Sequence, residues 1–282
     1  VSRGASVNAL DNIKLGTRPV RAELQFRTVA GRTHLARQYT PHPFHITRPF
    51  HHPGDPKGMA TLYLQSSSGG VYSGDDLSLD ITAEAQAQAH VTTQASTIVH
   101  DARGREGVTQ TVSLTVKDGA RLDYLPDPAI LMTGAKLCNR VTARIGKDAR
   151  VILADAQLSH DPEGCARPFA WLENEVEILG PKGPLLLDRF ELAGSDWPAR
   201  TGGFACSGMM IVVGDPHTGP KMLQAAEALP GIYPGLSVFK DRGIALIRFL
   251  ASDGAALTKA MTSMWRAAAT TLDGTPPAER RK

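Results

Sequence analysis

Four of the nine histidines of this 282-residue chain, His42, His45, His51 and His52, gather in residues 40–53, together with four prolines. Imidazole nitrogen is a good ligand for nickel and zinc. The segment has no His-Glu-x-x-His pattern and no cysteine, and its prolines prevent a helix that would place two histidines one turn apart. We expect a solvated loop, with adventitious nickel at His51 and His52. A β-rich metal-binding hydrolase using these four side chains stays open as the alternative function.

Two His–acid neighbours, His100-Asp101 and His160-Asp161, could suggest catalytic dyads. Adjacent residues on a strand point to opposite faces, so adjacency in the sequence argues against pairing. The chain has no Gly-x-Ser-x-Gly nucleophile elbow, and the three serines at 66–68 are typical of a polar turn. No catalytic residue is assigned, and we expect a protein that is not an enzyme.

Two aspartates stand out by their surroundings. Asp75 follows a glycine-rich turn, residues 69–74, and precedes an alternating segment, where an aspartate commonly accepts hydrogen bonds from backbone N–H groups. Asp155 lies in the largely apolar run 151–158, where an unpaired acid is costly to bury. It must find a partner or face a wet cavity. A passage lined by such acids could carry a hydrated divalent cation loosely, which suits transfer.

Other binding classes are poorly supported. The glycine-rich turn matches neither the Walker pattern nor Gly-x-Gly-x-x-Gly, so no phosphate loop is expected. A net charge of +3 with scattered basic residues does not favour nucleic acid. Three cysteines without a Cys-x-x-Cys pair indicate reduced thiols in a cytoplasm. No apolar stretch reads as a secretory signal or is long enough to span a membrane, so we expect no membrane partner and a cytoplasmic location.

The elements that must position these residues are mainly strands. Apolar and polar residues alternate at 77–82, 111–117, 141–145 and 175–178, as half-buried strands require, with turn residues between the segments. Residues 83–90 alternate too, although they are good helix formers, and the alternation favours a strand.

Helices are predicted only late in the chain, at 221–229 and 255–270. The second has an apolar face at three- and four-residue spacing, with Asp253 placed as N-cap and Gly274 just past the end. No linker or repeat divides the chain. We therefore predict one domain over residues 1–282, with flexible ends at 1–19 and 273–282.

The order of three segments resembles the urease accessory protein UreD (UreH) family, which shows a Gly-Gly-x-x-Gly-Gly-Asp turn, a Thr-Thr-Gln-Ala strand and a Leu-Pro-x-x-x-Ile segment. Further family motifs, including Arg48-Pro49-Phe50 and Met264-Trp265-Arg266, follow in the same order. The three segments are Gly69-Gly70-Val71-Tyr72-Ser73-Gly74-Asp75, Thr92-Thr93-Gln94-Ala95 and Leu125-Pro126-Asp127-Pro128-Ala129-Ile130.

The resemblance implies a mainly β fold of stacked sheets in a superhelical, β-helix-like arrangement with two amphipathic helices in the C-terminal third. It implies a non-catalytic nickel metallochaperone scaffold that binds apo-urease, UreF and, through UreF, the GTPase UreG, with UreE as a nickel donor. An internal tunnel would carry nickel(II) transiently, with no permanently bound cofactor. The family's tunnel acids correspond to Asp75 and Asp155 here.

Three departures from the family pattern are visible. Ser73 replaces a glycine of the turn, residues 159–164 read Ser-His-Asp-Pro-Glu-Gly instead of the usual Gly-Arg and Gly-Glu, and the C-terminal Pro-Arg-x-Trp ending is missing. These positions bear on the tunnel chemistry and on the partner surface.

Overall fold

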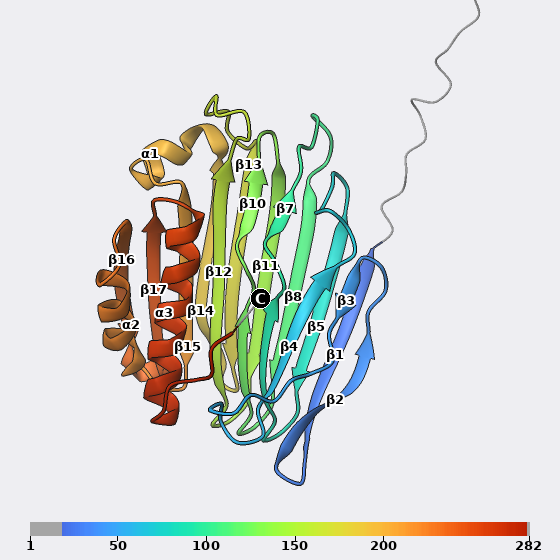
Figure 1. The fold of residues 1–282 in the computed structure, drawn as a ribbon, viewed down its shortest axis with the longest axis vertical. Helices are drawn as coiled ribbons and strands as arrows, with labels where there is room; N and C mark the ends of the chain where they lie inside the picture. The colour runs from blue at the N-terminus through green and yellow to red at the C-terminus, as the bar shows by residue number, and fades with distance from the viewer. Residues whose placement is uncertain (1–18, 281–282) are drawn as a thin grey trace, which may run out of the picture.

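The computed structural model describes residues 19–280 and shows two β-sheets that face each other, with helices on the outer side of one of them (Figure 1). The first sheet, called sheet A, has seven strands. In order across the sheet they are β14 (Gly183–Ala193), β13 (Trp171–Gly180), β11 (Lys136–Ile145), β8 (Val108–Val116), β5 (Asp76–Ala83), β1 (Val20–Val29) and β2 (Arg32–Tyr39).

The second sheet, called sheet B, has ten strands. Eight form one path, and two short strands lie beside it, β10 against β12 and β7 against β10. The path runs β16 (Ile232–Phe239), β17 (Ile244–Ala251), β15 (Cys206–Val213), β12 (Arg150–His160), β9 (Arg121–Leu125), β6 (Gln88–Thr93), β4 (Ala60–Ser66) and β3 (Phe44–Ile46), and the short pair is β10 (Ala129–Met132) and β7 (Thr97–Val99).

From β4 to β13 the chain alternates between the two sheets, so that each coil contributes a strand to each sheet. Neighbouring strands in this part are parallel, including β5 with β8, β8 with β11, and β6 with β9. Parallel strands joined by repeated crossovers form the stacked arrangement of a β-solenoid. The predicted fold class is confirmed.

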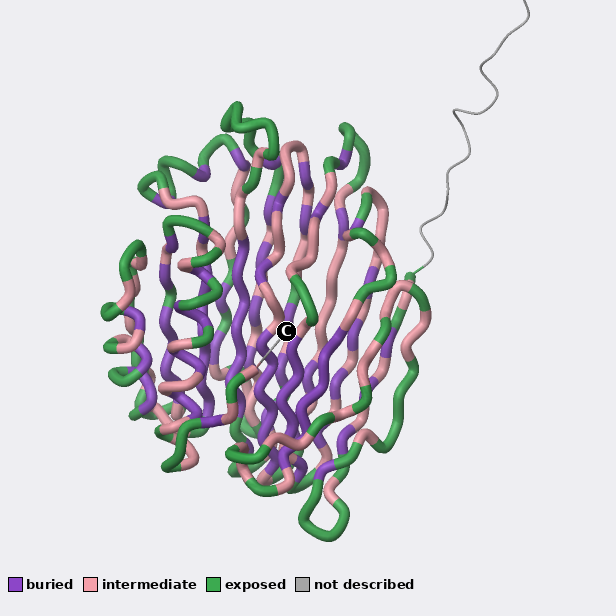
Figure 2. Tube along the Cα trace, viewed as in Figure 1, coloured by how far each residue is buried: buried purple, intermediate pink, exposed green. Residues whose placement is uncertain are grey.

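The main core lies between the sheets, because alternate residues of each strand point inward. In β5 the predicted alternation holds: Leu77, Leu79 and Ile81 are buried, and the polar residues between them are partly exposed. A second core fills the space between sheet B and the helices. Figure 2 shows buried positions running through the strands, with exposed loops at both ends of the strands.

The prediction of a continuous strand over residues 83–90 is wrong at its centre. Strand β5 ends at Ala83, β6 begins at Gln88, and the chain turns between them, with Gln86 at a φ of 62°. The Glu84 side chain accepts hydrogen bonds from Lys117 (2.7 Å) and from Gln25 (2.6 Å), which hold this turn on sheet A. Alanine and polar residues alternate through this turn as they would in a strand, so the pattern alone does not show where the strands end.

Three α-helices occur among the described residues, α1 (Trp197–Thr201), α2 (Thr218–Glu227) and α3 (Gly254–Asp273), with single 3₁₀ turns at Gly194–Asp196 and Lys240–Arg242. Both predicted helices exist, although α2 begins three residues early. The Asp253 carboxylate accepts hydrogen bonds from the N–H groups of Ala255 and Ala256, and Gly274 ends α3 at a φ of 72°, as expected of a cap at each end.

Of the two ends predicted to be flexible, the structure describes the C-terminal one as far as residue 280. Residues 1–18 lie outside the described residues. The end predicted to be flexible from 273 onward is held in place through residue 280, where Arg280 forms a buried ion pair with Asp55. No helix within residues 19–280 is long and apolar enough to cross a membrane.

Candidate functional site

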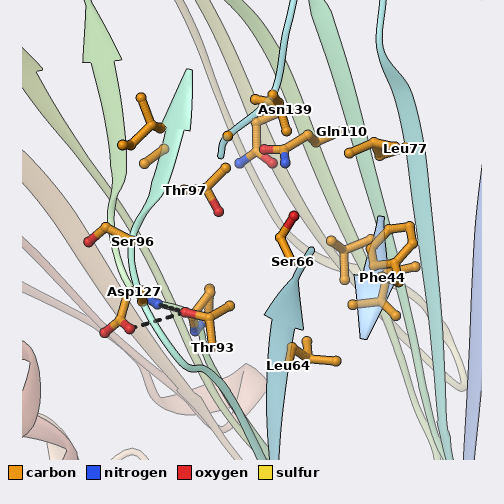
Figure 3. Close-up of a pocket in the computed structure, with 18 of the residues that line it drawn as sticks. Phe44, Leu64, Ser66, Leu77, Thr93, Ser96, Thr97, Gln110, Asp127 and Asn139 are labelled. Atoms are coloured by element: carbon orange, nitrogen blue, oxygen red, sulfur yellow. Dashed lines mark hydrogen bonds between the residues drawn. The ribbon is translucent and has the colours of Figure 1, made fainter. Parts of the chain in front are cut away.

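A cavity of about 650 Å³ opens between the two sheets. Its mouth is formed by three loops that follow strands of sheet B, at residues 66–70, 93–97 and 126–129. These loops belong to the three sequence segments singled out above, which therefore converge in space. Figure 3 shows Ser66, Thr97 and other polar side chains around the same open space.

The mouth is built by backbone contacts between the loops. Val71 donates a backbone hydrogen bond to the carbonyl oxygen of Ile98 (2.8 Å). Gly70 adopts a φ of 140°, and a Cβ at this position would lie 2.5 Å from the same oxygen, so only glycine fits. The Asp127 N–H donates to the Thr93 hydroxyl (2.8 Å), and that hydroxyl donates to the Asp127 carboxylate (3.2 Å; Figure 3).

Asp155 lies in the wall of this cavity and is 9% exposed. Three side-chain amides donate hydrogen bonds to its carboxylate: Asn139 to Oδ1 (3.2 Å), and Gln157 (2.8 Å) and Asn174 (2.7 Å) to Oδ2. Sequence reasoning left two outcomes for Asp155, a partner or a wet cavity, and the structure shows partners for its carboxylate and a cavity beside it. Its proposed contact with a metal ion stays a prediction.

The surroundings of Asp155 disfavour the charged form of its carboxyl. Burial raises the pKa of its carboxyl, and the nearby carboxylate of Asp188 raises it further, while the three amides oppose this shift. Because these hydrogen-bond partners are neutral, they orient the carboxylate without cancelling its charge. Asp188 is itself buried and forms an ion pair with Arg248 at the edge where β14 and β17 face each other.

Sequence reasoning missed the residues around Asp155. Asn174 is buried in β13 at a position where the alternation places apolar residues, between Leu172 and Val176. A polar residue at an inward position of an alternating strand is the signal that could have found it. Asp188 is buried in β14 between Leu186 and Phe190, so the same signal marks it.

Asp75 has a different environment from Asp155. Its carboxylate accepts a hydrogen bond from the Tyr72 N–H (2.8 Å), and its own N–H donates to the Tyr72 carbonyl (2.9 Å). It thus closes the turn that precedes β5, the local role expected from its position. Asp75 is not among the residues that line the cavity, and its contact with a metal ion also stays a prediction.

The four clustered histidines do not converge on one site. His42 pairs with the Ser67 hydroxyl (2.9 Å), whereas His51 donates to the Thr33 carbonyl (2.9 Å). The ring of His52 stacks on Phe50. Within residues 19–280, no group of three or more His, Cys, Asp or Glu side chains is arranged to hold a metal ion.

The His–acid neighbours do not pair either. The His100 ring stacks on Tyr72 with centroids 4.4 Å apart, whereas Asp101 accepts a hydrogen bond from the Arg103 N–H. Asp161 binds the Arg167 guanidinium, and this ion pair lowers the pKa of the Asp161 carboxyl.

The fold and the cavity define a class of protein: a β-solenoid with a mainly apolar internal cavity and a buried acid in its wall. Comparison with known proteins identifies one family. The family model described as UreD urease accessory protein matches residues 19–282. The chain belongs to this family.

Individual relatives are similar in sequence to this chain over most of their length. "Urease accessory protein UreD 1" of Methylorubrum populi is 40% identical, covering 94% of this chain and 92% of that protein. "Urease accessory protein UreD 3" of a Bradyrhizobium species is 37% identical, covering 94% and 95%. "Urease accessory protein UreD 1" of Pseudomonas syringae pv. tomato is 35% identical, covering 90% and 92%. These relatives are named as accessory proteins rather than enzymes.

Proposed function

We propose that this chain is a non-catalytic scaffold for urease maturation in the cytoplasm and that nickel(II) passes through its internal cavity as cargo. The observation that carries the proposal is Asp155, a buried carboxylate in the cavity wall with only neutral hydrogen-bond partners. A carboxylate of this kind attracts a divalent cation, and its oxygen atoms hold nickel more weakly than thiolate or imidazole would, so that the cation can leave again.

The wall of the cavity is mainly apolar, with polar groups between the apolar side chains that a hydrated ion could contact. Hydroxyl and amide groups line it, including those of Thr97, Gln110 and Asn139, and Figure 3 shows these side chains around the cavity. Such groups exchange hydrogen bonds with the water around an ion and bind the ion itself weakly. Asp75 is the second acid of the proposed path, at the turn where β5 begins.

The proposed partners follow from the family. The chain binds apo-urease and UreF, UreF brings the GTPase UreG, and UreE donates nickel. No nucleotide, resident cofactor, nucleic acid or membrane takes part on this chain itself.

Co-expression of the tagged chain with apo-urease, UreF and UreG, followed by pull-down and a nickel-dependent urease assay, tests the proposal. We expect apo-urease and UreF to co-purify, and urease activation to be lost when the chain is omitted. Activation at the full level without the chain, and no co-purification, would overturn the proposal.

A further inference from the structure

A cluster of buried polar side chains lies on the face of sheet B that is turned away from the cavity. Thr61, His90 and Asp123 are cross-strand neighbours on β4, β6 and β9. Trp265 of α3 covers them: its indole N–H donates to Asp123 (3.0 Å), and its ring lies 4.9 Å from that of His90. This cluster plays no part in the proposed path of nickel.

The C-terminal tail, residues 275–280, closes the cluster. Three hydrogen bonds from the tail converge on Asp55: one from the Ala278 N–H (3.0 Å), and two from the Arg280 guanidinium (3.1 and 2.9 Å). The guanidinium also lies over the Trp265 ring, 4.9 Å from its centroid. A bidentate carboxylate together with an aromatic face is the arrangement that recognises arginine rather than lysine.

The pair is buried, with the Asp55 side chain 1% exposed and the Arg280 side chain 8% exposed. A charge buried to this degree requires a partner, because an unpaired carboxylate at this place is strongly disfavoured. A cation at Asp55 therefore stabilises the folded protein, whichever chain provides it.

The tail uses only part of what this site offers. Three buried polar atoms of the site have no hydrogen-bond partner among the described residues: Thr61 Oγ1, His52 Nε2 and His90 Nδ1, which lies 3.8 Å from the Asp123 carboxylate. Nε of Arg280, in the tail, has none either. Each unsatisfied group costs free energy unless water enters. The tail has no helix or strand structure beyond Gly274, and besides Asp55 it contacts Arg266, which donates a hydrogen bond to the carbonyl of the buried Pro277.

We propose that Asp55, Trp265 and the adjoining His52 and His90 form an arginine-recognition pocket, which the chain's own tail fills and which accepts an extended arginine-bearing segment of a partner protein when the tail leaves. The unused hydrogen-bonding atoms are the reason that a partner segment with further polar groups competes with the tail. The tail is then a displaceable strap rather than a fixed part of the fold.

The test uses the full-length chain with Arg280→Ala, which empties the pocket, and an amidated synthetic peptide, Thr-Pro-Pro-Ala-Glu-Arg, as the probe. We expect the variant to bind the peptide at least tenfold more tightly than the wild type, whose pocket is occupied. A matched peptide with lysine in place of arginine should bind at least tenfold more weakly. Adding Asp55→Asn to the variant should abolish binding.

Absence of peptide binding to folded Arg280→Ala protein, or binding that Asp55→Asn leaves unchanged, would overturn the proposal. A second measurement on the wild type does not depend on the folding of any variant. Saturating peptide should displace the tail and speed hydrogen exchange at the Ala278 amide at least tenfold. An exchange rate unaffected by the arginine peptide would equally contradict the proposal.

Discussion

Asn174 of sheet A donates a 2.7 Å hydrogen bond to Asp155 of sheet B, so a polar contact joins the two sheets across the cavity wall. The Asn139 side chain, also on sheet A, donates hydrogen bonds both to the Asp155 carboxylate (3.2 Å) and to the side-chain amide oxygen of Asn174 (2.8 Å). The buried acid is thus fixed in position by amides from the opposite sheet.

Replacement of Asn174 by alanine should lower the free energy of unfolding by ~1–3 kcal/mol, because it removes a donor from a buried carboxylate. Denaturant unfolding of the single variants and of Asn174→Ala with Asp155→Leu measures the coupling. The loss should shrink when Asp155 is already leucine. An equal loss in both backgrounds would show that Asn174 acts through packing and not through the carboxylate.

Asp75 should have two separable roles, because its carboxylate closes a turn and belongs to the proposed path. Asp75→Ala should cost ~1 kcal/mol of stability, as the loss of a side chain that caps a backbone N–H does. Asp75→Asn keeps the acceptor oxygen and should preserve stability while lowering nickel-dependent urease activation. If Asp75→Asn activates urease as well as the wild type, Asp75 belongs only to the turn.

Gly70→Ala should destabilise the mouth of the cavity by ~1–3 kcal/mol, since the new Cβ would lie 2.5 Å from the Ile98 carbonyl and the backbone φ is 140°. Gly31→Ala is the matched control, because Gly31 also has a positive φ but nothing lies within 4 Å of its Cβ position. Thermal unfolding compares the two. A smaller loss for Gly70→Ala than for the control would contradict the contact between the loops.

The protein should lose stability on mild acidification because of His90. Burial is the main reason that the pKa of His90 is lowered in the folded state, so folding favours the neutral ring. The stability that depends on this neutral ring is complete above the unfolded value of about 6.5 and is lost as pH falls towards the folded value. The slope is at most about 1.4 kcal/mol per pH unit.

Denaturant unfolding between pH 7.5 and 5.5 checks this. His90→Gln should show a shallower pH dependence than the wild type. Asp123 does not confound the comparison, because its pKa is lowered in the folded state, and its contribution is lost only below the ordinary range of an aspartate, about 3.9. Identical slopes for the two proteins would exclude His90 as the titrating group.

Local signals in the sequence predicted a mainly β protein, both longer helices and the costly burial of Asp155, whereas the stacked arrangement was implied by the family resemblance. Alternation marks strands, spacing marks the apolar face of α3, and an acid in an apolar run marks a buried site. The neighbours of Asp155 depend on which strands of the two sheets face each other, and periodicity does not give that pairing. For this reason Asn174 and Asp188 were missed.

The docked C-terminal tail shows a second kind of limit. Its prolines and charges are typical of a solvated end, yet Arg280 pairs with Asp55, 225 residues earlier in the chain. Such a contact depends on the position where α3 ends over sheet B. Composition cannot indicate it.

The most direct test of the proposed path is the nickel content of urease matured in complexes that contain Asp155→Asn. This substitution removes the charge and keeps the shape, and the exposed Asp196→Asn serves as the matched control. We predict that both variants assemble with apo-urease and UreF, and that Asp155→Asn lowers urease nickel and activity at least tenfold while Asp196→Asn does not. Full nickel loading with Asp155→Asn would contradict transfer past this residue.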